Sequence, residues 1–136
     1  MSLVDKILPV YRDEEAEVLD LIERHYATLE QTIHTGDQTP NDDALESVLP
    51  FIRVGRVGGA PRRGSEHTDR PVVDVDVFSM TRAEAKRIAL EIQQLLMSAP
   101  RPIDACNVLM GPQRVPWVEG SPIRRMYASY HLALRR

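Results

Sequence analysis

The chain has 136 residues, 43% hydrophobic and 5% aromatic, which suffices for one mainly aliphatic core and excludes a disordered or fibrous chain. A net charge of −3 is too small to indicate a general nucleic-acid binder, and a single cysteine, Cys106, excludes an internal disulfide framework or a cysteine-rich zinc site. No apolar run is long enough for a signal peptide or a membrane span, so we expect a soluble intracellular or assembled protein.

Charge is divided unevenly along the sequence. Residues 1–50 hold three basic and twelve acidic residues, whereas residues 51–136 hold fourteen basic and eight acidic ones, so the two parts carry −9 and +6. Two interpretations stay open. One is a chance distribution of solvated charge, and the other is head-to-tail self-association of an acidic face with a basic face.

The first predicted element is an amphipathic helix that begins at Asp13, a residue able to cap it, with two glutamates in the first turn. Apolar residues follow at three- and four-residue spacings as far as Ile33, and Gly36 is the expected terminator. Residues 35–43 are polar and contain Pro40, so we expect them to form a connection without regular structure.

Two strands around a long loop are predicted next. Residues 51–57 alternate in polarity, and residues 72–78 place valines on one side of a strand and Asp74 and Asp76 on the other. Residues 58–70 are rich in glycine and arginine and lack apolar periodicity. We expect this segment to be a loop that docks a protein partner, with plain flexibility as the alternative.

The second helix has the clearest start signal. Residues 81–84 (TRAE) fit a capping box, in which the Thr81 hydroxyl and the Glu84 carboxylate each satisfy an exposed backbone N–H. Apolar residues then recur at helical spacing as far as Ala99, and Pro100 ends the run.

The last predicted elements are strands at 103–110, 115–118 and 124–134, the first two separated by a turn at Gly111-Pro112. The whole order predicts an α+β fold with a largely antiparallel sheet of four or five strands and two main helices on one face. We expect one domain over residues 1–136, with an acidic helix and connection in 1–46 and the strands and second helix in 47–136.

The Asp74–Asp76 pair is the first candidate for chemistry. Two carboxylates two residues apart on a strand point to one face, about 7 Å apart, where they could bind a hard cation or serve in acid–base catalysis. The favoured interpretation is structural. The aspartates form the solvated or intersubunit face of a one-sided sheet and pair with arginines across it, such as Arg53 or Arg56.

Other catalytic interpretations are weaker. Ser65, His67 and Asp69 are the residue types of a hydrolytic triad, but a glycine-rich loop does not hold them rigidly. Cys106 and His131 could form a thiol–imidazole pair, yet a lone strand cysteine is more often a small buried hydrophobe. We therefore predict no catalytic, cofactor or metal site. The candidate partner-binding residues are Arg53, Arg56, Arg62, Arg63, Arg70, Asp74 and Asp76.

Several segments of the second half resemble one known family. They are residues 49–54 (LPFIRV), 56–59 (RVGG), 73–78 (VDVDVF), the helix with Ala83, Ala85 and Ala89, and residues 125–132 (RMYASYHL). Together they resemble the tail terminator, or tail-to-head joining, proteins of long-tailed (siphovirus-type) bacteriophages. The resemblance covers residues 48–136 and includes the order of the elements.

This resemblance implies a non-enzymatic protein of the virion. Members of the family form small α+β domains that assemble as a homo-oligomer, usually a hexameric ring, at the head-proximal end of the tail tube. There they end tube polymerisation and provide the head attachment surface. The implied partners are the chain itself, the major tail tube protein and a head-completion or stopper protein of the neck. DNA would pass through the ring without specific binding, and no membrane is involved. The implied location is the head–tail junction, with the host cytoplasm during assembly.

Two alternatives remain open from sequence. The first is another phage neck protein, such as a head-completion or connector protein, which has the same kind of composition. The second is a small metal-dependent hydrolase that uses Asp74 and Asp76. In the tail terminator family the loop between the two central strands reaches toward the tail tube, so the resemblance implies the same role for residues 58–70.

Overall fold

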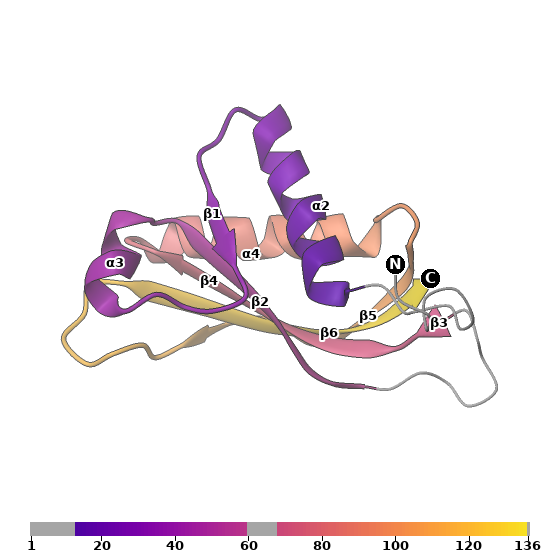
Figure 1. The fold of residues 1–136 in the computed structure, drawn as a ribbon. Helices are drawn as coiled ribbons and strands as arrows, with labels where there is room; N and C mark the ends of the chain where they lie inside the picture. Colours follow the sequence, from indigo (N-terminus) through magenta and orange to yellow (C-terminus); the bar gives the residue numbers. More distant parts are fainter. Residues whose placement is uncertain (1–12, 60–67, 136) are drawn as a thin grey trace, which may run out of the picture.

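The computed structural model describes residues 13–59 and 68–135, in which six strands form one sheet and two long helices lie on one of its faces (Figure 1). This confirms the predicted α+β class and its largely antiparallel sheet. The elements in chain order are α2 (Glu14–Thr28), β1 (His34–Gly36), α3 (Asp42–Ser47), β2 (Phe51–Gly59), β3 (Thr68–Asp69), β4 (Pro71–Ser79), α4 (Arg82–Met97), β5 (Ile103–Val115) and β6 (Arg124–Arg135). No described helix is long and apolar enough to cross a membrane.

The sheet runs in the order β1-β2-β4-β6, and β5 pairs with the other side of β6. The β1–β2 pair is parallel, whereas the β2–β4, β4–β6 and β5–β6 pairs are antiparallel. The two-residue strand β3 continues the line of β4 along β6, because Asp69 pairs with Leu134 and Val72 with His131. The edges of the sheet are therefore the short strand β1 and the long strand β5.

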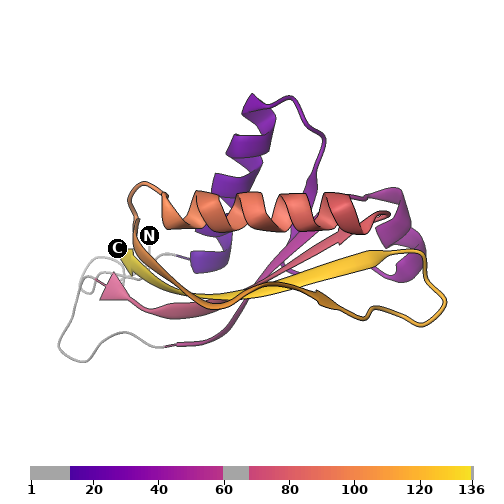
Figure 2. The same cartoon turned by 180° about the vertical axis from the view of Figure 1, so that it is seen from behind.

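The main core lies between the sheet and the helices α2 and α4. Alternate residues of the central strands, such as Val75, Val77 and Ala128, face this layer and are at most 2% exposed. Figure 2 shows α4 lying along the sheet from the opposite side. A smaller cluster on the other face joins Leu45 of α3 to Phe51, Phe78 and Ile123. The sheet is thus covered by helices on one face and only at one end on the other.

Helix α2 ends earlier than its apolar pattern predicts. The Asp13 cap is confirmed, since its carboxylate accepts hydrogen bonds from the backbone N–H groups of Glu15 and Ala16. The helix stops at Thr28, however, and not at Gly36. Glu30 adopts a left-handed backbone conformation (φ 55°), and the N–H groups of residues 30 and 31 bond the carbonyls of residues 27 and 26. This is the Schellman arrangement that terminates helices.

The connection predicted at residues 35–43 contains regular structure. Strand β1 includes Thr35 and Gly36, and it pairs with the start of β2. Helix α3 begins after Asn41, whose side chain accepts a hydrogen bond from the N–H of Ala44. Both elements are short and mostly polar, so they have no apolar periodicity that sequence could reveal. Tertiary contacts with the sheet define them instead.

The predicted loop 58–70 is shorter than expected at both ends. Strand β2 continues to Gly59, and β3 begins at Thr68. Gly59 has a positive φ of 86°, and a Cβ there would lie 2.1 Å from the carbonyl oxygen of Arg70, so only glycine fits this close approach. Residues 60–67 lie outside the described residues.

The start of α4 agrees with the sequence, with one change. Thr81 caps the helix by accepting a hydrogen bond from the N–H of Glu84 at 3.2 Å. The Glu84 carboxylate does not complete a reciprocal capping box; it accepts a hydrogen bond from the Ser79 hydroxyl at 2.6 Å. Glu84 therefore ties the first turn of the helix to the end of β4.

The separate strand predicted at 115–118 is wrong, since residues 116–118 are not in a strand. The strand predicted at 103–110 continues through Gly111-Pro112 to Val115 as one strand, β5. Proline is tolerated there because β5 is an edge strand, where a missing N–H does not interrupt a second ladder. The register against β6 shifts at three places, one of them between Met110 and Gln113. The expected turn is thus an irregularity within the strand.

Two buried tyrosines predict a loss of stability at alkaline pH. Burial and a 2.9 Å hydrogen bond to Glu91 raise the pKa of Tyr26, and burial raises the pKa of Tyr130. The unfolded chain releases these protons near pH 10, whereas the folded chain keeps them to higher pH. The free energy of unfolding therefore falls above pH 10, by about 1.4 kcal/mol per pH unit for each tyrosine. We expect the melting temperature to fall steeply between roughly pH 10 and 12. Tyr26→Phe should make that fall shallower, and an equally steep fall in the variant would contradict the assignment to Tyr26.

Candidate interaction surfaces

A buried carboxylate connects the three central strands on the face opposite the main helices. Asp76 of β4 is 1% exposed and accepts hydrogen bonds from Arg53 of β2 at 3.2 Å and from Arg125 of β6 at 2.7 Å. Arg125 also lies within about 6 Å of the ring centres of three aromatic residues, Phe78, Trp117 and Tyr127. The predicted pairing of an aspartate with Arg53 across the sheet is confirmed.

The expectation that the aspartates form a solvated face is wrong. Asp74 is 9% exposed, and its carboxylate accepts a 2.7 Å hydrogen bond from the Tyr127 hydroxyl, which contributes to the raised pKa of that tyrosine after burial itself. Small aspartates between longer side chains of the neighbouring strands are shielded from water by those side chains. Both carboxylates are thus held by donors from the chain. Within residues 13–59 and 68–135 no group of three or more His, Cys, Asp or Glu is arranged to hold a metal ion.

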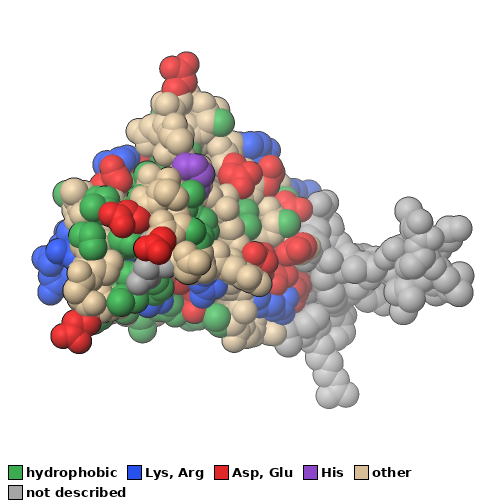
Figure 3. All heavy atoms as spheres, turned by 60° about the vertical axis from the view of Figure 1, so that its left-hand side comes forward, with side chains coloured by type: hydrophobic (Ala, Val, Ile, Leu, Met, Phe, Trp, Pro, Cys, Tyr) green, Lys and Arg blue, Asp and Glu red, His purple; other side chains and the backbone are tan. Residues whose placement is uncertain are grey.

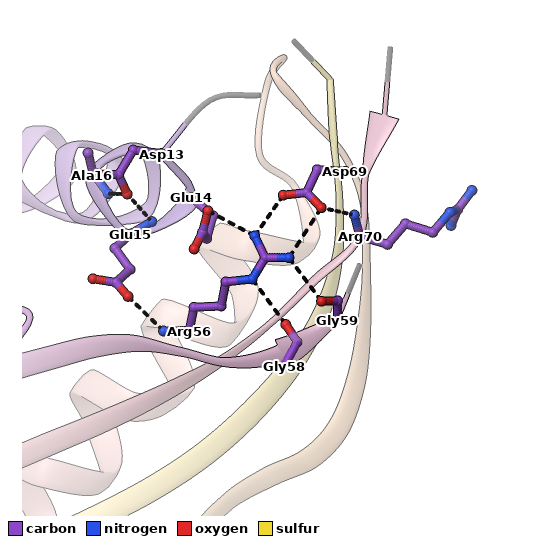
Figure 4. Close-up of polar contacts among 9 residues, drawn as sticks. All are labelled: Asp13, Glu14, Glu15, Ala16, Arg56, Gly58, Gly59, Asp69 and Arg70. Atoms are coloured by element: carbon purple, nitrogen blue, oxygen red, sulfur yellow. Dashed lines mark hydrogen bonds and ion pairs between the residues drawn. The ribbon is translucent and has the colours of Figure 1, made fainter. Parts of the chain in front are cut away.

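Arg56, the second arginine expected to pair with this aspartate face, lies in a different cluster (Figure 4). Its guanidinium bonds Asp69 of β3 at 2.8 Å and Glu14 of α2 at 3.2 Å, and it also donates to the carbonyls of Gly58 and Gly59. The Asp69 hydrogen bond is the main cause of the raised pKa of Arg56. The expected partner surface at Arg56 is therefore largely occupied by contacts within the chain.

The backbone N–H of Arg56 also has a hydrogen-bond partner within the chain. The N–H of Arg56 points out of the sheet edge and donates to the Glu15 carboxylate at 2.9 Å. Two glutamates at the start of α2 thus engage the exposed part of β2, one through the guanidinium and one through the backbone. Side chains from α2 take the place that an additional strand would occupy.

The remaining predicted site residues do not converge on one surface. Arg70 is half-buried beside Asp69, and its Nε is a buried donor without an acceptor in the described structure. Arg62 and Arg63 lie outside the described residues, and so do Ser65 and His67 of the triad interpretation. Asp69, its third member, binds Arg56.

The thiol–imidazole pair is not formed. Cys106 pairs with Leu132 and packs against the main core, whereas His131, one position along β6, lies on the opposite face of the sheet. Burial raises the pKa of the Cys106 thiol to about 11, so it is a weak nucleophile at neutral pH. This agrees with the prediction of a small packing residue.

Sequence reasoning missed a basic hollow at the end of the β5–β6 pair. It has a volume of about 290 Å³, and its charged lining residues are Arg82, Arg114, Arg124 and Arg125. Trp117 forms part of the wall, and its indole N–H is a buried donor without an acceptor in the described structure. In the sequence, three arginines lie near a tryptophan within residues 114–125, and this clustering could have indicated the hollow.

Exposed apolar residues lie on the same strand as this hollow. Val108, Leu109 and Met110 of β5 are 38–56% exposed, on an edge that no described strand covers. The N-terminal part of the described chain carries most of the exposed acidic side chains. Figure 3 shows acidic side chains spread over the face that carries α2 and α3. The candidate surfaces of the described residues are thus the edge strand β5 with the basic hollow at its end, and the acidic face over α2 and α3.

No protein-family model and no curated protein matches the chain. Solved structures do match, among them a chain of the "Virion of native gene transfer agent (GTA) particle". That chain is 15% identical, and the match covers 90% of this chain and 95% of that one, with a TM-score of 0.49. The likeness concerns the arrangement of the chain and assigns no role to any residue.

The Asp76 contacts predict a specific loss of stability. Asp76→Asn leaves two guanidiniums, each about a quarter exposed, without their carboxylate. We expect a loss of about 2–3 kcal/mol in the free energy of unfolding, less than the roughly 3–5 kcal/mol of a fully buried pair because both arginines still contact water. Urea unfolding measures it. Asp104→Asn, which breaks the more exposed pair with Arg135, is the control and should cost no more than about 0.5 kcal/mol. Equal losses in the two variants would contradict a central role for Asp76.

The Cys106 environment predicts slow alkylation. At pH 8 a thiol with a pKa of about 11 is ionised far less than an ordinary one, so iodoacetamide should react on the order of 100-fold more slowly with the folded chain than with the chain in urea. Mass spectrometry of quenched samples gives both rates. Similar rates in the folded and unfolded chains would show that Cys106 is not shielded.

Proposed function

We propose that this chain is a structural subunit of a phage-type virion and acts as a tail terminator. In this role it forms a ring, of six subunits as the family resemblance suggests, on the head-proximal end of the tail tube. It stops addition of tube subunits and offers the surface to which the filled head attaches. It performs no catalysis, and DNA passes through the ring without sequence-specific contacts.

The observation that carries the proposal is where the resembling residues lie. The segments at 49–54, 56–59, 73–78 and 125–132 form the adjacent strands β2, β4 and β6, and the helix with the three alanines is α4. The resemblance therefore concerns one continuous part of the fold, with its elements in the expected order. The similar solved chain belongs to a virion particle. That this chain does so too is part of the proposal, which rests on the resembling segments and not on that likeness.

The candidate surfaces support an assembly role over the hydrolase alternative. Asp74 and Asp76 are bonded to Tyr127, Arg53 and Arg125, so neither carboxylate is open to a metal ion or a substrate. What the described chain does offer outward is an exposed apolar edge strand and two regions of opposite charge. Such features suit contacts between protein subunits.

Loss of the gene in the phage that encodes the chain tests the proposal. We expect tails of abnormal and variable length that do not join to heads, because nothing ends the tube or offers the attachment surface. Negative-stain electron microscopy of the lysate measures tail lengths, and expression of the wild-type chain from a plasmid should restore normal particles. Tails of normal length without attached heads would favour another neck protein, and fully normal particles would overturn the virion role.

A further inference from the structure

The basic hollow carries charged donors at its rim. Three exposed arginines, Arg82, Arg114 and Arg124, line it, and none of them forms an ion pair with a residue of 13–59 or 68–135. Arg124 donates only to a backbone carbonyl, at 3.4 Å. Arg125, by contrast, is held by Asp76. The rim therefore offers planar guanidinium forks that match the two oxygens of a carboxylate or a phosphate from outside the chain.

The walls of the hollow are apolar and contain an unsatisfied donor. They are formed by four aliphatic residues and one aromatic ring, at Val115, Pro116, Trp117, Val118 and Ile123. The Trp117 indole N–H is buried and has no acceptor in the described structure. A buried donor without an acceptor is unfavourable, so a group that brings an acceptor to the side of this ring gains a hydrogen bond that an apolar group does not.

The surroundings of Trp117 suit a peptide side chain better than a nucleobase. The ring of Phe78 contacts that of Trp117 edge-on, with 4.9 Å between the ring centres. The Arg125 guanidinium lies 5.7 Å from the centre of the Trp117 ring. Single-stranded nucleic acid binds chiefly by stacking its bases on free aromatic faces, and these two contacts leave little of the ring free for that.

The charge of the neighbouring helix α3 also disfavours nucleic acid. Leu45 of α3 packs in the same apolar cluster as Ile123 and Trp117, so α3 lies next to the hollow. The side chains of Asp43 and Glu46 on this helix are exposed, and neither forms an ion pair with a described residue. A row of phosphates along this end of the molecule would be repelled by them, whereas one carboxylate beside the arginines needs no contact with α3.

We propose that the basic hollow is a docking site for a short acidic segment of another protein, in which a glutamate or aspartate lies between apolar residues. The carboxylate of that segment binds the guanidiniums of Arg114 and Arg124, and its apolar neighbours cover the wall around Trp117. A hollow of about 290 Å³ accepts side chains of such a segment and not a folded domain. The inference goes beyond the proposed function, because it assigns the chemistry of a partner from the hollow alone.

Fluorescence of the full-length chain tests the proposal, because Trp117 is its single tryptophan. The probes are the synthetic peptide acetyl-Gly-Leu-Glu-Leu-Gly-amide and the same peptide with glutamine in place of glutamate. The glutamate peptide should change the Trp117 emission in a saturable way, and its binding should weaken with added salt. The glutamine peptide should bind at least about tenfold more weakly, because it lacks the charge that strengthens hydrogen bonds to guanidiniums.

A pair of variants locates the binding in the hollow. Arg114→Gln with Arg124→Gln should raise the dissociation constant of the glutamate peptide by at least about tenfold. Lys86→Gln with Arg101→Gln is the matched control, since it removes the same two charges at exposed positions that do not line the hollow. Its affinity should equal that of the wild type. Circular dichroism spectra that match the wild type show that each variant is folded.

Four outcomes would overturn the inference: no saturable change with the glutamate peptide, equal binding of the two peptides, equal affinity in the hollow variant and the matched control, or tighter binding of a single-stranded oligothymidylate at the hollow. The last outcome would assign the hollow to nucleic acid. Failure of the proposed function is distinct, since the chain would then bind the glutamate peptide as described while deletion of the gene leaves tails and heads normal.

Discussion

The long helices cover only one face of the sheet. The fold therefore depends on how the buried polar side chains of the other face find hydrogen-bond partners. Asp76 provides the central contact, since one buried carboxylate accepts from an arginine of each neighbouring strand. Arg53 lies directly opposite Asp76, whereas Arg125 reaches it diagonally from its position opposite Phe78, so the two contacts join β2, β4 and β6. Arg125 also contacts the rings of Phe78 and Trp117. A buried charge is tolerated there only because both partners are present.

Contacts within the chain also limit what the edges of the sheet can bind. At β2, the start of α2 supplies Glu14 and Glu15, which bind the side chain and the backbone of Arg56 and leave little room for an added strand. At β5, three shifts in register and a proline disrupt the regular row of donors and acceptors. Both are devices that limit uncontrolled strand pairing. Specific association through charge is compatible with such edges, because it does not require a continuous backbone ladder.

A subunit of this kind suits an assembly in which position matters more than chemistry. The reactive groups are either bonded within the chain, as Asp74 and Asp76 are, or shielded, as Cys106 is. The groups that remain available among the described residues are the exposed arginines of the hollow and the exposed carboxylates of the N-terminal part. For the proposed terminator, a rigid central sheet would hold the surfaces that meet neighbouring subunits at a constant angle, and that angle decides whether the contacts close into a ring.

Sequence alone determined the elements whose signals are local. The alternation in residues 72–78, the Thr81 cap and the apolar spacing of α4 depend on neighbours a few residues away, and the structure agrees with each of them. The end of α2 was mispredicted for a local reason, because the apolar spacing continues past the Schellman turn at Glu30. The strand β1 and the continuity of β5 depended on contacts with distant segments, and sequence mispredicted them. The choice of partners depended on such contacts most of all. Asp76 binds an arginine 49 residues away, and Arg56 binds Asp69 and not the aspartates of β4, because register and edge position decide which side chains meet. The basic hollow follows the same rule, since its arginines come from three separate elements and become neighbours only when α4, β5 and β6 are packed together.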